Sequence, residues 1–385
     1  MARLGDVGKV VTGNTPKTSD SQNYASNDIC FVKPSDIADG IVTYLNDSEF
    51  YISEHARAKA RILPPKSVLV TCIGIIGKVA INNVECAFNQ QINAIVPDKS
   101  KCLTEYLAYA IQNKQEEMQD IANAPVVPIL NKTQFSDIEI KLPSLSEQKD
   151  IIQKLNAVSK LISLRKEQLA KLDQLVKSRF IELFGMVGSD EKDWGLTRLG
   201  DCCVVNPKKA ADNRLCADLM VSFVPMPAVS ENGEIDASEI KAYNEVKTGF
   251  TYFAEQDVLF AKITPCMENG KGAVARGLCN GIGFGSTEFH VLRPIEGITN
   301  PYWIYTVTAF EQFRVAAAAD MTGSAGQRRV PASFLENYRI AVPPIEQQEQ
   351  FAAFVEQTDK SKLAIQQSLD KLELLKKSLM QEYFG

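Results

Sequence analysis

Histidine is scarce in this sequence, and the cysteines lack the spacing of a metal-binding motif. There are 2 His, at positions 55 and 290, and 9 Cys, none of them in a Cys-x-x-Cys pair. A structural zinc site needs four soft ligands at short spacing, so the sequence predicts no metal site. Scattered cysteines are typical of reduced core thiols in a cytosolic protein, and we expect a cytoplasmic location.

Long hydrophobic runs are also missing. No segment approaches the roughly 18 apolar residues of a membrane span, and residues 1–10 lack the apolar core of a secretion signal. We therefore expect neither membrane insertion nor secretion. Hydrophobic residues still make up 45% of the 385, which is enough to bury proper cores. Because the net charge is −5, any affinity for nucleic acid has to come from local basic surfaces.

The motifs of several enzyme classes are absent. The sequence has no nucleotide-binding fingerprint and no Asn-Pro-Pro-aromatic tetrapeptide, with which DNA methyltransferases hold a flipped adenine. Asp137, Glu139 and Lys141 resemble part of a nuclease motif, but the second half has Asn337 and Arg339 at the corresponding places. A short β-strand explains the triplet better, and we expect a chain that is not an enzyme.

What the sequence does contain is an internal repeat. Arg-Leu-Gly-Asp at 3–6 recurs at 198–201, and Tyr-x-x-Tyr at 106–109 recurs at 302–305. From Pro143 onward the two halves align without a gap at an offset of 200 residues, and both end in Phe-Gly. The register and the matching landmarks indicate a true duplication.

Each half has a β-rich part and a helical part. The first kind carries β-branched runs broken by Gly and Pro, such as 67–74 and 257–264, which predict short strands and turns. Residues 146–184 and 346–384 contain no Gly or Pro and are rich in Leu, Lys, Glu and Gln. Those two segments predict long helices, each spanning roughly 58 Å.

Apolar residues recur along both predicted helices at the a and d spacing of a coiled coil. Arg165, Arg179 and Lys376 interrupt the seams, and an amphipathic helix lying on a globular core is the alternative. The residues that we expect to pack helix against helix are Leu155, Ile162, Leu169, Leu172, Val176, Ile365, Leu369, Leu372 and Leu379.

The repeat predicts an α+β protein with two β-rich mixed domains, or heads, and two long α-helices that form an antiparallel coiled coil. A pseudo-twofold axis would relate the halves. Such a device holds two binding surfaces apart, and DNA is the natural ligand because half-sites repeat along a regular duplex. The predicted divisions are 1–142 (first head), 143–185 (first helix), 186–193 (linker), 194–342 (second head) and 343–385 (second helix).

The order of head, helix, head and helix resembles the DNA specificity subunits of type I restriction–modification systems, and the resemblance covers essentially the whole chain. It is carried by Leu-Gly-Asp at the start of each head and by Pro-x-x-x-x-Gln at each helix entry, with Gln148 and Gln348. Further phrases are FVKPSDI at 31–37, FNQQ at 88–91 and GFGSTEF at 283–289.

The resemblance implies that each head is a target-recognition domain that reads one half of a split sequence in double-stranded DNA. It implies that the helices set the gap of unread base pairs and dock two methyltransferase subunits, to which restriction and translocase subunits attach. No cofactor is expected in this chain, because S-adenosylmethionine, ATP and Mg²⁺ would belong to those partners.

Candidate DNA contacts in the first head are side chains that can reach base edges or phosphates. The amides at 89–91 can bind adenine, with the outer two on one face if the segment is extended; a polar strand edge at a turn explains them equally well. A loop at 74–78 can bring a lysine to a phosphate, and the loop near position 15 is also typical of a solvated turn. The candidates are Thr15, Lys17, Lys33, Lys78, Asn89, Gln90 and Gln91.

The second head offers polar side chains at 262–271, beside a glycine that permits close approach. Residues 286–288 match 89–91 in the repeat, and 328–329 is the densest basic patch of this head, suited to a phosphate. Ordinary loop, cap and surface residues are the alternative. The candidates are Lys262, Thr264, Asn269, Lys271, Ser286, Thr287, Glu288, Arg328 and Arg329.

Two other classes of function stay open. One is an enzyme that carries its own DNA reader, which is disfavoured because the duplicated unit accounts for nearly every residue. The other is an adaptor of a DNA-modification complex, whose coiled coil binds only protein and whose heads have no affinity for DNA.

Overall fold

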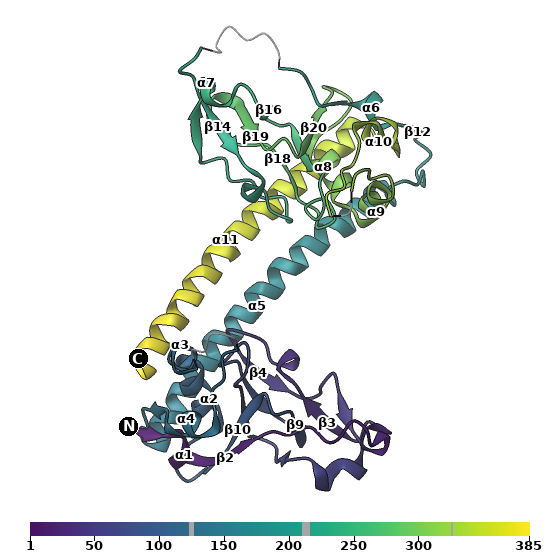
Figure 1. Cartoon of the computed structure of the whole chain (residues 1–385). Coiled ribbons are helices and arrows are strands. Elements are labelled where there is room, and N and C mark those ends of the chain that lie inside the picture. Colours follow the sequence, from purple (N-terminus) through teal and green to yellow (C-terminus); the bar gives the residue numbers. More distant parts are fainter. Residues whose placement is uncertain (123–126, 210–215, 325) are drawn as a thin grey trace. The chain divides into compact units, whose positions relative to one another are not determined.

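The computed structural model describes residues 1–122, 127–209, 216–324 and 326–385. Its contacts divide the chain into unit 1, Met1–Lys166 with Gln367–Gly385, and unit 2, Glu167–Gln366. Each unit contains one β-rich head and one segment of each long helix (Figure 1). The α+β architecture with two long helices confirms the predicted fold class.

The first head contains two sheets and a two-stranded ribbon. The strand orders are β2-β10-β7-β8-β4 and β5-β3-β9-β6, and β1 pairs with β11. In the second sheet β3 and β9 run parallel, while their outer neighbours are antiparallel. The strands are β1 Ala2–Arg3, β2 Gly8–Thr12, β3 Ile29–Val32, β4 Val42–Leu45, β5 Tyr51–Ile52, β6 Ile62–Leu63, β7 Val68–Thr71, β8 Val79–Asn82, β9 Cys86–Phe88, β10 Ile92–Pro97 and β11 Glu139–Ile140.

The second head repeats this arrangement, except that its first sheet, in the part of the chain that the structure describes, has four strands and lacks an equivalent of β4. Its sheets have the orders β13-β20-β17-β18 and β15-β14-β19-β16, with β14 and β19 parallel and a β12–β21 ribbon. The duplication read from the sequence therefore extends to the strand topology. The strands are β12 Leu196–Arg198, β13 Cys203–Val205, β14 Met220–Val224, β15 Ile240–Ala242, β16 Thr251–Ala254, β17 Val258–Ala261, β18 Gly272–Val274, β19 Ile282–Gly285, β20 Phe289–Pro294 and β21 Arg339–Ala341.

Helix α2 packs on the sheet that contains β7 and β8, and helix α8 packs on the equivalent sheet that contains β17 and β18. Tyr106, Leu107 and Ile111 of α2 are fully buried, as are Ile304 and Val307 of α8, because both helices turn apolar faces toward the core. The short helices are α1 Leu4–Val7, α2 Thr104–Asn113, α3 Gln115–Ile121, α4 Lys132–Asp137, α6 Leu199–Cys202, α7 Tyr243–Val246, α8 Pro301–Ala309, α9 Glu311–Ala319 and α10 Ala332–Asn337.

The long helices are α5, Leu145–Phe184, and α11, Ile345–Phe384, and they run antiparallel. In unit 1, Lys154 Nζ donates to the Tyr383 hydroxyl at 3.1 Å, and Lys166 pairs with Glu373 at 2.9 Å. In unit 2, Lys362 pairs with Asp173 at 2.5 Å. Residue numbers thus rise along α5 as they fall along α11, which confirms the predicted antiparallel coiled coil.

The helix seam is apolar but is interrupted by charge. Lys376 is half-buried, and burial lowers the pKa of its ammonium group; Arg179 instead pairs with Glu182 at 2.8 Å. Leucines at other positions of the heptad, such as Leu161 and Leu374, are exposed. The structure buries Leu155 and Leu369, and it half-buries Ile162, Leu169, Leu172, Val176, Ile365, Leu372 and Leu379.

Each head also packs on the far end of the other long helix. In unit 1, Phe384 of α11 joins the core of the first head, with its ring centroid 5.2 Å from that of Tyr106. In unit 2, Phe180 of α5 joins the core of the second head and lies 4.9 Å from Phe310 and 5.5 Å from Phe351. Each head is thus attached to both helices and not only to the one that follows it.

A buried glutamine fixes each head to the start of its own helix. Gln148 accepts a hydrogen bond from the Leu103 N–H at 2.9 Å and donates to the carbonyls of Lys101 and Pro143 at 3.0 and 2.9 Å. Gln348 makes the matching set with the Asn300 N–H and with the carbonyls of Ile298 and Pro343. All six partners are backbone groups, so the joint does not depend on the side chains of the head.

Candidate nucleic-acid interface

The turns after β9 and after β19 occupy the same place in the two heads. The N–H of Asn89 donates to the Val32 carbonyl at 3.1 Å, and that of Ser286 donates to the Val224 carbonyl at 3.4 Å. Each turn therefore leaves its sheet beside the parallel partner strand. The two polar triplets that the repeat pairs in sequence are equivalent in structure.

In the first head this segment is a turn and not an extended strand. Asn89 is only 6% exposed, and its amide donates to Gln91 Oε1 at 2.8 Å while its own oxygen accepts from the Gln91 N–H at 3.1 Å. Gln90 is exposed and accepts from the Thr15 hydroxyl at 2.7 Å. Asn89 therefore stabilises the turn, and the side-chain amides of Gln90 and Gln91 are the ones that the turn leaves available to DNA.

Three chain segments meet beside this turn, at a place that we call strand junction 1. The Cys72 N–H donates to the Gln91 carbonyl at 2.8 Å, and the Leu130 N–H donates to the Cys72 carbonyl at 2.9 Å. Beneath them Asn93, 1% exposed, accepts from the Thr12 hydroxyl at 2.7 Å and donates to the Leu130 carbonyl at 3.2 Å. These bonds tie the turn and the segment at Leu130 to one sheet.

Strand junction 2, in the second head, has the same bonds with different side chains. The Lys262 N–H donates to the Glu288 carbonyl, and the Val330 N–H donates to the Lys262 carbonyl, both at 2.9 Å. His290 takes the place of Asn93: its Nε2 lies 2.8 Å from the Val330 carbonyl, and its Nδ1 lies 3.0 Å from the Asn206 amide. This polar support was not among the residues predicted from the sequence, although the alignment that matches 286–288 with 89–91 also pairs His290 with Asn93.

His290 makes the stability of unit 2 sensitive to acid. The imidazole is buried, and desolvation lowers its pKa below the usual 6.5, whereas the Val330 carbonyl and the nearby Glu288 and Glu336 act in the opposite direction and Lys262 adds to the lowering. Below about pH 6.5 the unfolded chain therefore binds a proton that the folded chain does not. The free energy of unfolding of unit 2 therefore decreases as the pH is lowered. We expect thermal unfolding between pH 7 and pH 5 to show this loss.

The variant His290→Asn, which copies the first head, should lose less stability over the same pH range. The asparagine can donate to the Val330 carbonyl, as Asn93 does to Leu130, and it does not titrate. Parallel pH profiles for the two proteins would contradict the assignment.

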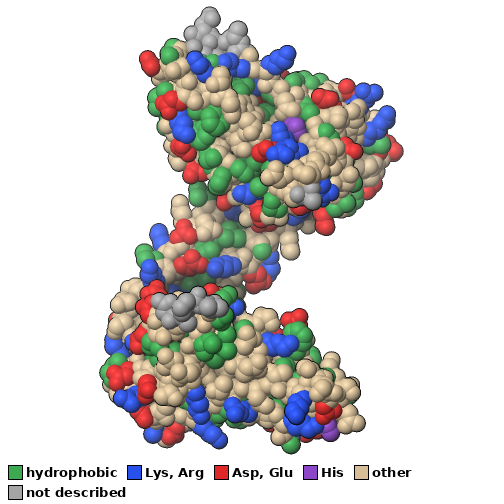
Figure 2. All heavy atoms as spheres, viewed as in Figure 1, with side chains coloured by type: hydrophobic (Ala, Val, Ile, Leu, Met, Phe, Trp, Pro, Cys, Tyr) green, Lys and Arg blue, Asp and Glu red, His purple; other side chains and the backbone are tan. Residues whose placement is uncertain are grey.

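Charged pairs cover strand junction 2. Arg329 donates to both carboxylate oxygens of Glu288, at 2.8 and 2.9 Å, and this pairing lowers the pKa of the Glu288 carboxyl. Arg328 Nη2 lies 3.3 Å from Glu268 Oε1, and the backbone N–H of Arg328 donates to the Thr264 hydroxyl at 3.2 Å. Basic and acidic side chains gather there next to a histidine (Figure 2). The patch is therefore less basic than the sequence indicates.

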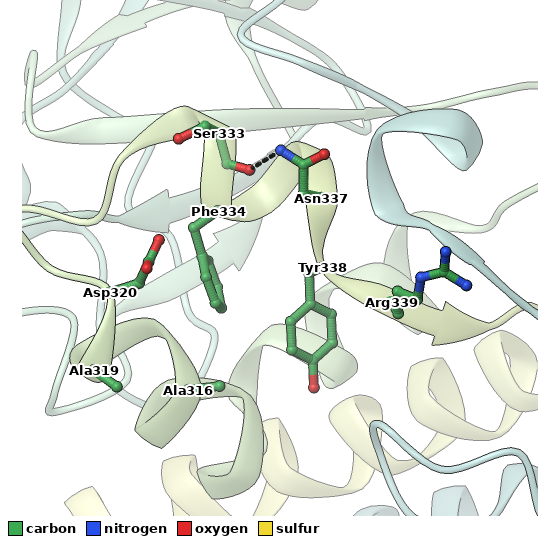
Figure 3. Close-up of a pocket in the computed structure, with 8 residues that line it drawn as sticks. All are labelled: Ala316, Ala319, Asp320, Ser333, Phe334, Asn337, Tyr338 and Arg339. Carbon is green, nitrogen blue, oxygen red and sulfur yellow. Dashed lines mark hydrogen bonds between the residues drawn. The ribbon is translucent and has the colours of Figure 1, made fainter.

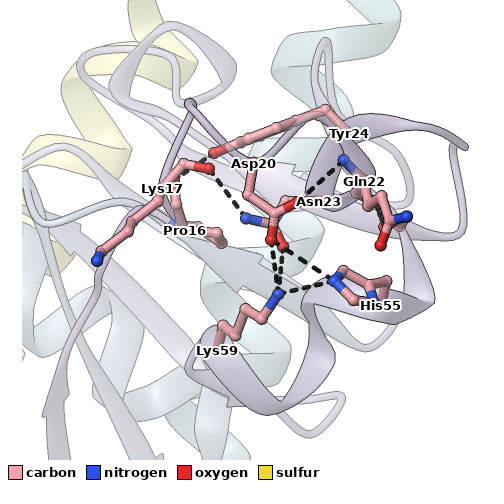
Figure 4. A network of polar contacts seen from close by, with 9 residues as sticks. Pro16, Lys17, Asp20, Gln22, Asn23, Tyr24, His55 and Lys59 are labelled. Carbon is pink, nitrogen blue, oxygen red and sulfur yellow. Dashed lines mark hydrogen bonds and ion pairs between the residues drawn. The ribbon is translucent and has the colours of Figure 1, made fainter.

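The loop that carries Lys17 is held by a polar network (Figure 4). Asn23 donates to the Lys17 carbonyl at 2.9 Å, and Lys59 Nζ donates to Asp20 at 2.8 Å and to Asn23 Oδ1 at 3.1 Å. The ion pair lowers the pKa of the Asp20 carboxyl. The ammonium of Lys17 points away from this network (Figure 4), so it stays available to an anion.

The remaining candidates lie in other surroundings. Lys33 Nζ stands 3.1 Å from the centroid of the Phe50 ring, a cation–π contact. Lys78 is half-buried after Gly77, where the positive φ of 85° and the close approach of Gln115 require a glycine. In the second head, Asn269 and Thr287 are exposed, and Lys271 and Ser286 are half-buried.

A shallow hollow lies elsewhere on the second head and contains none of these candidates. It has a volume of about 520 Å³ and is walled by Phe334, Tyr338 and the small side chains of α9 (Figure 3). Asn337 closes one side by donating to the Ser333 carbonyl at 2.8 Å. Its charged groups, Asp320 and Arg339, make no arrangement of nucleophile and base.

Within the described ranges, no group of three or more His, Cys, Asp or Glu side chains could hold a metal ion. All nine cysteines are free, and burial raises the pKa of the Cys72 thiol to about 11 and that of Cys86 to about 12. Among the helices that the structure describes, none is long and apolar enough to cross a membrane.

Comparison with known proteins identifies the family. A family model described as the type I restriction modification DNA specificity domain matches residues 1–174 and 191–374. The chain belongs to this family, as the sequence resemblance predicted. Specificity subunits of type I restriction systems are not catalytic, because catalysis lies in other subunits.

Individual relatives match parts of the chain. The specificity subunit of the type I restriction enzyme EcoEI of Escherichia coli is 39% identical over 194 residues, which cover 48% of this chain and 31% of that protein. The EcoAI specificity subunit of the same organism is 38% identical over 199 residues, 49% of this chain and 32% of that protein. The matched segments thus span about a third of the length of these curated relatives.

A solved structure shares the fold along the whole chain. The S subunit of a type I restriction–modification system from M. genitalium superposes with a TM-score of 0.54 at 12% identity, covering 100% of this chain and 95% of that one. At this identity the likeness concerns the fold.

Proposed function

We propose that this chain reads a bipartite target in double-stranded DNA on behalf of a type I restriction–modification complex. The first head, residues 1–142, reads one half of the target, and the second head, 194–342, reads the other. Helices α5 and α11 set the unread gap and dock two methyltransferase subunits, through which restriction subunits join. The observation that carries the proposal is the duplicated head: apart from the extra strand β4 of the first head, the two heads have the same strand order and the same junction beside a polar turn.

The candidate side chains divide by chemistry into two groups. Lysines and arginines meet phosphates and fix the register on the duplex, whereas amides and hydroxyls meet base edges. We assign Lys17, Lys33, Lys78, Lys262, Lys271 and Arg328 to phosphates, and Thr15, Gln90, Gln91, Thr264, Asn269 and Thr287 to bases or to their immediate support. Asn89 and Ser286 hold the two turns.

The salt dependence of DNA binding tests the proposal. We expect the complex of this chain with its methyltransferase subunits to bind target DNA with an affinity that falls on the order of 10³-fold between 50 and 200 mM salt, since about six phosphates are neutralised. Replacing Lys17, Lys78 and Lys262 by Gln should reduce the slope of log affinity against log salt by about one per lysine.

Replacing the exposed linker residue Lys192 by Gln serves as the control and should leave the slope unchanged. The competing function is the protein-binding adaptor, which the net charge of −5 favours. If the methyltransferase subunits bound DNA equally well with and without this chain, the adaptor would be the better description.

A further inference from the structure

Arg329 of the second head stands where the first head has an isoleucine. Ile129 forms an isolated β-bridge with Ile73, and Arg329 forms the matching bridge with Ile263. Each of these positions directly precedes the junction residue that bonds to the sheet, Leu130 or Val330. Ile129 is 50% exposed, and the Arg329 side chain is 41% exposed, so both side chains are presented at the same place on the surface.

The neighbouring position differs in the same sense. The residue whose carbonyl accepts at the junction is Gln91 in the first head and Glu288 in the second. At these two equivalent positions the first head has an amide and an apolar side chain, Gln91 and Ile129. The second head has a carboxylate and a guanidinium, Glu288 and Arg329. Because the backbone bonds around them are the same, the difference lies in what the side chains can recognise.

Glu288 holds the guanidinium of Arg329 from one side. Nε donates to one carboxylate oxygen at 2.9 Å, Nη2 donates to the other at 2.8 Å, and Nη1 donates to the Gln327 carbonyl at 3.2 Å. An arginine has five N–H groups, so one N–H remains on each terminal nitrogen. No hydrogen-bond acceptor for these two N–H groups is recorded among the described residues, and the Glu288 side chain is only 26% exposed.

Two N–H groups on the adjacent terminal nitrogens of a guanidinium fit two adjacent acceptors. Guanine offers such a pair at N7 and O6 in the major groove, whereas adenine offers one acceptor and one donor. We propose that Arg329, oriented by Glu288, is the residue with which the second head recognises a guanine in its half-site. This assignment rests on the proposed function; the first head, with Ile129 and Gln91, lacks the contact.

Glu288 has a positioning role in this arrangement. Its carboxylate repels the DNA phosphates, but it keeps Arg329 from turning toward a phosphate, which would bind any sequence. We expect Glu288→Gln to bind all duplexes more tightly and to discriminate less at the guanine position. That split between affinity and discrimination distinguishes positioning from a merely structural effect.

The experiment measures binding of the full complex, with its methyltransferase subunits, to duplexes that carry each of the four base pairs at every position of the second half-site. The wild type should prefer guanine at one position by about ten- to a hundred-fold. Arg329→Gln and Arg329→Lys should reduce that preference to a few-fold and leave the other positions and the first half-site unchanged. The lysine variant keeps a cation beside Glu288, which limits any loss of folding.

The controls separate this inference from the proposed function. Arg339→Gln, at an exposed arginine of the same head, should change nothing. If Arg329→Gln kept the full preference at every position, or weakened all sequences evenly as loss of a phosphate contact does, the assignment to guanine would be wrong. If the wild-type complex showed no sequence preference in either half-site, the proposed function itself would fail.

Discussion

Inserting one heptad into each long helix should lengthen the unread gap of the DNA target by about three base pairs. Seven helical residues add about 10.5 Å, and each base pair adds about 3.4 Å along the duplex. The insertions belong at the level of Lys166 in α5 and Glu373 in α11, which form an ion pair. Placed there, they keep the antiparallel seam in phase and leave both heads and both glutamine joints untouched.

The measurement is the spacing of methylated sites in cells that carry the altered chain with its methyltransferase subunits. The bases read in each half should stay the same, because no head residue changes. A matched control replaces one heptad of each helix by another of the same length and should leave the spacing as it was. If the lengthened chain still directed methylation to the original spacing, the helices would not be the ruler.

Replacing residues 1–142 by the head of a relative with another target should change one half-site completely and leave the other as it is. The joint permits such an exchange, because Gln148 bonds to the backbone groups of Lys101 and Leu103, which any head of this fold supplies, and of Pro143, which lies outside the exchanged segment. The core contact made by Phe384 is the more demanding part, since it needs an aromatic or large apolar residue at Tyr106.

Sequencing of modified sites measures the outcome of the exchange. The matched control returns the original head through the same cloning junctions and should restore the original target. A change in both half-sites, or in neither, would contradict independent reading by the two heads.

The fold was largely predictable from the sequence because its strongest signals are local. Two stretches without Gly or Pro predict the long helices, and the offset of 200 residues predicts that they are equivalent. The packing of Phe180 and Phe384 on the far heads was not predictable, since it depends on which helix end meets which head. The available sign was the matching pair Phe184 and Phe384, one aromatic residue at the end of each helix.

The candidate site was harder to predict because pairing decides it. Residues 286–288 and 328–329 were each selected for their chemistry, but the bond between Glu288 and Arg329 joins positions 41 residues apart and depends on the loop that returns to β20. Asn89 was selected as a base reader, whereas the folded turn uses its amide to hold Gln91. The sequence therefore predicts which segments contain candidate DNA contacts, and the tertiary contacts decide which of their side chains remain available to DNA.

The most direct test is to map the methylated bases in the genome of a cell that carries this chain together with its methyltransferase subunits. We expect the methylated sites to share one target made of two short constant sequences separated by a fixed number of unread base pairs, with a guanine that depends on Arg329 in the second half. A single uninterrupted target, or methylation that does not depend on this chain, would contradict this expectation.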